Sequence, residues 1–90
     1  MAIEVRIPTI LRTYTGGDKA VDASGDTLAA LIDDLEANHP GIKERLLEAG
    51  EVRRFVNVYV NDEDVRFTGA LETQLSDGDQ VVILPAVAGG

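Results

Sequence analysis

One amphipathic helix pattern limits the fold of this chain more than any other feature. Apolar residues recur at the i, i+3, i+4 and i+7 positions of a helix: Leu28, Leu31, Ile32 and Leu35. A single apolar stripe has no second long helix to pack against, so it must be buried on the face of a β-sheet. The sequence therefore predicts an α+β fold in which one main helix covers a small sheet.

The segments that flank this helix contain its start and stop signals. Residues 24–27 offer several N-cap side chains, and Pro40 disfavours helical geometry in the residue before it, so the helix should end near His39. His39 is the only histidine. We interpret it as structural, because a cation is mildly favoured at a helix C-terminus. The sequence of residues 42–47 predicts a short second helix, which should end before Gly50.

Short segments on both sides of the helix have β-strand patterns. Residues 3–7 alternate between apolar and polar side chains up to Pro8, and residues 55–60 are all β-formers except Asn57. The remaining predicted elements are strands over 19–23, 65–67 and 80–84, and a turn or single helical turn over 71–75. The first two strands should form a hairpin with a long loop.

Two polar turns in the sequence lack the residues that binding loops need. Gly16 and Gly17 are not followed by Gly-Lys-Ser/Thr, so they predict a hairpin turn and no phosphate-binding loop. The carboxylates of residues 61–64 lack the spacing and the glycine of a calcium loop. The acidic residues at 33, 34 and 36 are typical of a solvated helix face. We therefore predict no metal site.

Composition narrows the function further. A length of 90 residues predicts a single domain. The net charge of -8 should repel nucleic-acid phosphates, so we do not expect the protein to bind nucleic acid. That charge either favours a partner with a basic docking surface or serves solubility. The absence of cysteine excludes disulfides and thiolate catalysis. No signal peptide begins the chain, and residues 81–88 are too short to span a membrane, so we expect a cytoplasmic protein.

The chain does not have the side chains of an independent enzyme. Its single histidine has no evident partner nucleophile, so we assign no catalytic residue. The distinctive reactive group is the carboxylate of Gly90.

The last five residues predict a tail on the domain. Pro85 has no backbone N–H, so strand pairing should fray there, and we divide the chain into a domain over 1–85 and a flexible tail over 86–90. Five extended residues span at most roughly 17 Å, enough to enter a neighbouring active site. Gly89 has no Cβ and suits a narrow channel. Val87 and Ala88 would help to position the tail.

The order of elements and the C-terminal sequence resemble the ubiquitin-like β-grasp sulfur carriers, the ThiS/MoaD family. The resemblance covers nearly the whole chain and rests on the helix entry Asp26-Thr27-Leu28, the strand at 55–61 and the pattern from Leu75 to Gly90. It implies a mixed sheet of four to five strands wrapped on one main helix with a short second helix.

The resemblance also implies a chemistry for Gly90. An E1-like enzyme would adenylate its carboxylate with ATP, and a sulfur donor would convert it to a thiocarboxylate. The blocks at 7–12, 54–67 and 83–90 are similar to those of carriers that serve cysteine biosynthesis. In that branch a pyridoxal-phosphate-dependent cysteine synthase accepts the sulfur and a zinc metallopeptidase releases cysteine. The carrier itself would bind neither cofactor and would not be an enzyme.

Several questions stay open at the level of sequence. The same C-terminus would serve a carrier for molybdopterin synthesis, a ubiquitin-like protein modifier, or an interaction module whose tail is incidental. The sulfur donor, the final acceptor and the oligomeric state are not encoded in a recognisable motif. A partner should also contact an apolar patch on the exposed sheet face, but the register that decides which residues of 55–60 face outward is unknown.

Overall fold

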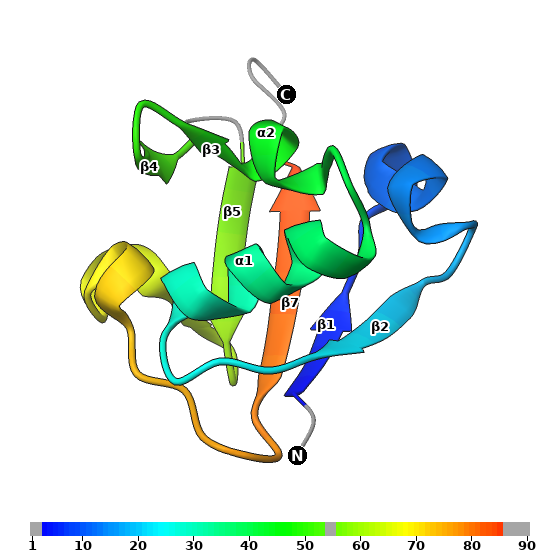
Figure 1. The fold of residues 1–90 in the computed structure, drawn as a ribbon. Helices are drawn as coiled ribbons and strands as arrows, with labels where there is room; N and C mark the ends of the chain where they lie inside the picture. Colours follow the sequence, from blue (N-terminus) through cyan, green and yellow to red (C-terminus); the bar gives the residue numbers. More distant parts are fainter. Residues whose placement is uncertain (1–2, 54–55, 86–90) are drawn as a thin grey trace.

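The computed structural model describes residues 3–53 and 56–85. Their centre is a mixed sheet in the order β2-β1-β7-β5-β6 (Figure 1). These strands are β1 (Ile3–Arg6), β2 (Ala20–Ala23), β5 (Val56–Val60), β6 (Glu63–Asp64) and β7 (Gln80–Pro85). The last strand, β7, is central: it runs parallel to β1 and antiparallel to β5. This is the β-grasp arrangement that the resemblance to the sulfur carriers implies.

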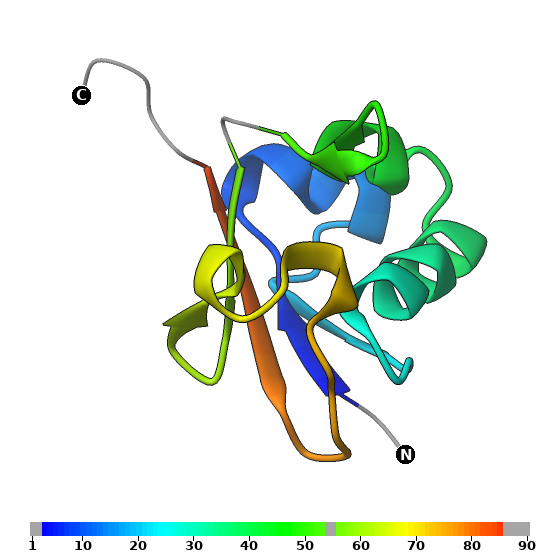
Figure 2. The ribbon, with the colours of Figure 1, turned by 90° about the vertical axis from the view of Figure 1, so that its left-hand side faces the viewer.

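The helices and a small hairpin complete the described chain. They are α1 (Leu28–Asn38), α2 (Ile42–Leu46), β3 (Leu47–Glu48), β4 (Glu51–Val52), and the 3₁₀ helices η1 (Thr9–Thr15), η2 (Val65–Phe67) and η3 (Ala70–Glu72). Helices α1 and α2 lie on the same face of the sheet, as Figure 2 shows from the side. In the described part of the chain, neither of these two helices covers the opposite face of the sheet (Figure 2).

The core forms where the apolar stripe of α1 meets the inner face of the sheet. Each residue of that stripe is at most 1% exposed, which confirms the helix prediction. The facing sheet side chains are equally apolar because β1, β5 and β7 alternate inward and outward: Ile3, Val5, Val56, Val58, Val60, Val81 and Ile83 are buried. Helix and sheet therefore share one hydrophobic core.

The start of α1 is fixed by a cap and a close backbone approach. The Thr27 hydroxyl accepts a hydrogen bond from the Ala30 amide at 3.2 Å. Gly25 lies so close to the first turn that a Cβ at this position would sit 2.5 Å from the Leu31 nitrogen. Because backbone atoms cannot yield as a side chain would, only glycine fits here.

We therefore expect Gly25→Ala to lower the free energy of unfolding by about 1–3 kcal/mol, the usual range for overpacking. Urea denaturation measures this change. Ser24→Ala is the matched control, because the Ser24 side chain is exposed and its expected effect is within about 0.5 kcal/mol. Equal stability of the two variants would contradict the close approach.

The turn between α1 and α2 is held by the Glu36 carboxylate. It accepts hydrogen bonds from the backbone amides of Gly41, at 3.0 Å, and Lys43, at 2.9 Å. These two bonds favour the ionised form and hold the pKa of Glu36 below its usual range. His39 caps the C-terminus of α1, where the sequence predicts the helix end.

Glu36→Ala should lower the melting temperature at neutral pH, with Glu36→Gln intermediate because its amide oxygen still accepts one bond. A carboxyl group whose pKa is lower in the folded state than in the unfolded state contributes its full stabilisation of the fold at pH values above its unfolded-state pKa, about 4.3. This contribution is lost as the pH falls through the folded-state pKa. The difference between wild type and Glu36→Gln should be constant from pH 8 to about 5.5 and shrink below about 4.3. A pH-independent difference in calorimetry would rule out the carboxylate as its cause.

One strand prediction is wrong. Residues 65–67 form the 3₁₀ helix η2, and the strand that pairs with β5 is Glu63–Asp64. The reason is local. Asn61 and Asp62 both have positive φ, so the chain turns within two residues and pairs immediately. The Asp64 carboxylate then accepts a bond from the Arg66 amide at 2.9 Å and starts a helical turn.

Two further elements differ from the sequence prediction. Residues 9–15 form η1 inside the predicted hairpin loop. The turn predicted at Gly16 and Gly17 is confirmed, and both glycines have positive φ. Helix α2 ends at Leu46, one residue before the predicted end, and β3 and β4 form a hairpin through Ala49 and Gly50. The predicted helical turn near residues 71–75 corresponds to η3.

Candidate functional site

The residues that the sequence analysis assigns to the site lie outside the described part of the chain. They are Gly90, Gly89, Ala88 and Val87. The assignments of the tail boundary and of these four residues therefore stay predictions. What the structure places is Pro85, the residue before the predicted tail, at the end of β7.

Strand β7 ends at Pro85, one residue beyond the predicted strand. Pro85 lies opposite Val56 of β5, and the preceding residues alternate between the two faces of the sheet. Ile83 points into the core and is 3% exposed, whereas Leu84 is 44% exposed. The strand that precedes the predicted tail therefore has its inward side chains anchored in the core.

The register of β5 answers the question of which side chains face outward. Asn57 and Tyr59 lie on the outer face, opposite Leu84 and Val82 of β7. The Asn57 side-chain oxygen accepts a hydrogen bond from Arg66 at 2.7 Å. Tyr59, Val82 and Leu84, with Asp62, line a shallow apolar depression on this face.

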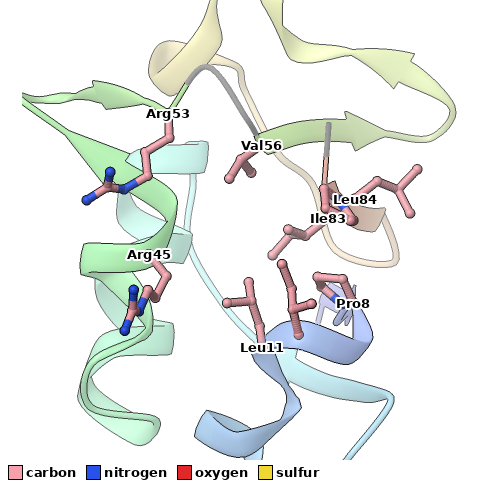
Figure 3. A pocket seen from close by; sticks show the side chains of 9 residues that line it. Pro8, Leu11, Arg45, Arg53, Val56, Ile83 and Leu84 are labelled. Atoms are coloured by element: carbon pink, nitrogen blue, oxygen red, sulfur yellow. The ribbon is translucent and has the colours of Figure 1, made fainter. Parts of the chain in front are cut away.

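A second depression lies at the end of the sheet from which the tail begins; we call it the root pocket. Its volume is about 230 Å³ (Figure 3). The lining residues come from η1 and the residue before it, from α2, from the residue that follows β4, and from β5 and β7. They are Pro8, Ile10, Leu11, Arg45, Arg53, Val56, Ile83, Leu84 and Pro85. Its wall is mostly apolar. The two arginines lie on the α2 side, and their guanidinium groups point away from the apolar side chains of the pocket (Figure 3).

Contacts with neighbouring residues hold both arginines in place. Arg45 Nε donates a hydrogen bond to the Tyr14 hydroxyl at 2.7 Å, and this bond raises the pKa of Arg45. The guanidinium carbon lies 5.9 Å from the centroid of the Tyr14 ring. Arg53 Nε donates to the Glu44 carbonyl at 2.9 Å. Sequence patterns did not single out either arginine, since the pocket joins segments that are distant along the chain.

The acidic clusters have structural roles in the described residues. Asp34 accepts a bond from the Ser24 amide, Asp33 pairs with Lys43, and Glu36 and Asp64 act in turns as described above. Within residues 3–53 and 56–85 no group of three or more His, Cys, Asp or Glu residues could hold a metal ion. None of the helices in these same ranges is long and apolar enough to cross a membrane.

The whole domain and its C-terminal segment match a known protein family. The chain belongs to the ThiS family, whose model matches residues 5–90. Sulfur carrier protein CysO of Mycobacterium tuberculosis is 64% identical over 93 residues, covering 100% of both chains. A chain in the crystal structure of the Amycolatopsis orientalis BexX/CysO complex is 61% identical, with a TM-score of 0.95 over 99% of this chain and 100% of that one. Small archaeal modifier protein 3 of Haloferax volcanii is 36% identical over 92 residues, again covering 100% of both chains.

The two faces of β7 should respond differently to truncation. Ile83→Ala should lower the free energy of unfolding by about 2–5 kcal/mol, because it leaves a cavity in the core. Leu84→Ala should cost less than about 1 kcal/mol, since Leu84 is largely exposed. Urea denaturation of both variants checks the register. Similar decreases in the free energy of unfolding for the two variants would contradict a register in which Ile83 faces the core and Leu84 faces outward.

Proposed function

We propose that this protein is a sulfur carrier that holds sulfur as a thiocarboxylate on Gly90. The observation that carries the proposal is the full-length 64% identity to a sulfur carrier protein, together with a family match that extends to Gly90. The position of β7 supports it. A central strand anchored by Val81 and Ile83 presents the start of the tail at one end of the domain.

The proposed chemistry uses the carrier as a co-substrate. A Gly90 carboxylate oxygen attacks the α-phosphorus of ATP in an E1-like enzyme, and pyrophosphate leaves. Sulfur from a donor then attacks the acyl carbon and displaces AMP, which leaves the thiocarboxylate. Because deprotonated sulfur is the reactive form, as it is in thiolates, the loaded C-terminus is a nucleophile at neutral pH. The absence of cysteine removes any thiol in the chain that could capture the adenylate.

We propose cysteine biosynthesis as the destination of the sulfur. The similarity of the strand and tail blocks to carriers of that branch supports this acceptor over molybdopterin synthesis. A pyridoxal-phosphate-dependent cysteine synthase would take the sulfur onto a serine-derived acceptor, and a zinc metallopeptidase would release cysteine. Both cofactors belong to the partners, and the carrier needs none. Because loading consumes ATP, we place this chemistry in the cytoplasm.

Intact mass spectrometry tests the carrier function. Incubation with ATP, sulfide and the E1-like enzyme should add the mass difference between one sulfur and one oxygen. Protein that lacks Gly90 is the control and should show no gain, because it has lost the reacting carboxylate at its native position.

Other outcomes of this test favour different functions. An unchanged mass with an enzyme that loads another carrier would contradict the sulfur-carrier proposal. Isopeptide conjugates on lysines of other proteins would support the modifier function instead, which the similarity to a small archaeal modifier protein makes the second candidate.

A further inference from the structure

The root pocket has a composition that the loading chemistry at Gly90 does not explain. We propose that it is the docking site for the activating enzyme. In this inference, which rests on the proposed function, a segment at the mouth of the enzyme's channel places one apolar side chain in the pocket. A neighbouring carboxylate of that segment pairs with Arg45 and Arg53.

The length of the tail determines where the enzyme must make contact. Residues 86–90 reach at most roughly 17 Å from Pro85, and Pro85 itself lines the root pocket. An enzyme that buries Gly90 in a channel must therefore place the mouth of that channel against this end of the domain. Because Pro85 is part of the wall of the root pocket, this pocket is within reach of such a contact.

The apolar part of the pocket suits an inserted side chain. Leu11, Val56 and Ile83 form a buried floor, while Ile10 at the rim is 67% exposed. A large aliphatic side chain in that position leaves apolar surface in water, and exposed apolar patches beside a depression mark interaction sites. An apolar side chain from a partner would cover both the floor and Ile10.

The charge of the pocket points to an acidic partner segment. The chain carries a net charge of -8, yet the described residues that line this pocket include two arginines and no carboxylate. Glu44 and Glu48 lie beside the same arginines, in a neighbouring depression. Among the described residues Arg45 makes no ion pair, and Arg53 makes one long, exposed ion pair with Glu48 at 3.6 Å, which a partner carboxylate would have to replace. Both cations are already positioned by Tyr14 and the Glu44 carbonyl, so a partner carboxylate would find them with little side-chain entropy left to lose.

Steady-state loading of Gly90 by the purified E1-like enzyme, with ATP and sulfide, tests the charged half of the proposal. Arg45→Glu and Arg53→Glu should each raise KM for the carrier about tenfold, because a like charge now faces the partner carboxylate. The kcat should change less than about twofold, since the tail and its carboxylate are intact. Lys19→Glu makes the same charge change at an exposed residue that does not line the pocket and should leave KM within about twofold.

A second pair of variants tests the apolar half. Ile10→Ser should raise KM several-fold, whereas Phe67→Ser, at an 86% exposed residue outside the pocket, should not. Because all these side chains lie at the surface, thermal unfolding of each variant should match wild type and exclude misfolding as the cause.

The possible outcomes separate this inference from the proposed function. If wild type is loaded at Gly90 and the arginine and Ile10 variants have the same KM as wild type, the docking site is wrong and the carrier function is unaffected. Failure of wild type to load overturns both. Two other occupants of the pocket would also overturn the docking site. One is the protein's own tail, which would be indicated if deletion of residues 86–90 shifts the NMR signals of Ile10 and Arg53. The other is a second copy of the chain, which would be indicated if ultracentrifugation detects dimers that Arg53→Glu abolishes.

Discussion

The pairing of β7 with both β1 and β5 is the constraint on which the rest of the structure depends. The last described strand occupies the middle of the sheet, so within the described sheet the N-terminal hairpin and strands β5 and β6 are connected through β7. Its inward residues Val81 and Ile83 contribute to the core that the α1 stripe covers. The same strand brings the start of the tail to one end of the domain. Folding of the core and presentation of the C-terminus are therefore consequences of one set of backbone pairings.

The sequence predicted what short-range patterns control. The helix stripe, its Thr27 cap and the alternation of β1 all depend on residue spacing within one element, and the structure has each of them. The prediction of a strand over 65–67 was wrong because β-formers there were outweighed by a tight turn at Asn61-Asp62 and by the Asp64 side chain. Turn geometry decided the outcome, and it depends on backbone angles that hydrophobic periodicity does not report.

The candidate site also has one part that the sequence predicts and one part that it does not. Gly90 and its neighbours are recognisable from the end of the sequence and from family resemblance, because the chemistry needs only a C-terminal carboxylate and a slim tail. The root pocket is different. Its walls combine Leu11, Arg45 and Ile83, which lie far apart in the chain and meet only through sheet order and the α2 turn. No local motif marks such a set, so only the folded structure reveals it.

The central position of β7 also has a mechanical consequence. An enzyme that draws the tail into its channel pulls along the axis of β7, parallel to the strand. The hydrogen bonds to β1 and β5 run across that direction, so the load falls on them together in shear and cannot open them one after another. The domain can thus resist repeated pulling on its C-terminus without unravelling from that end. A carrier used for many rounds of loading and delivery would benefit from a strand that cannot be peeled away.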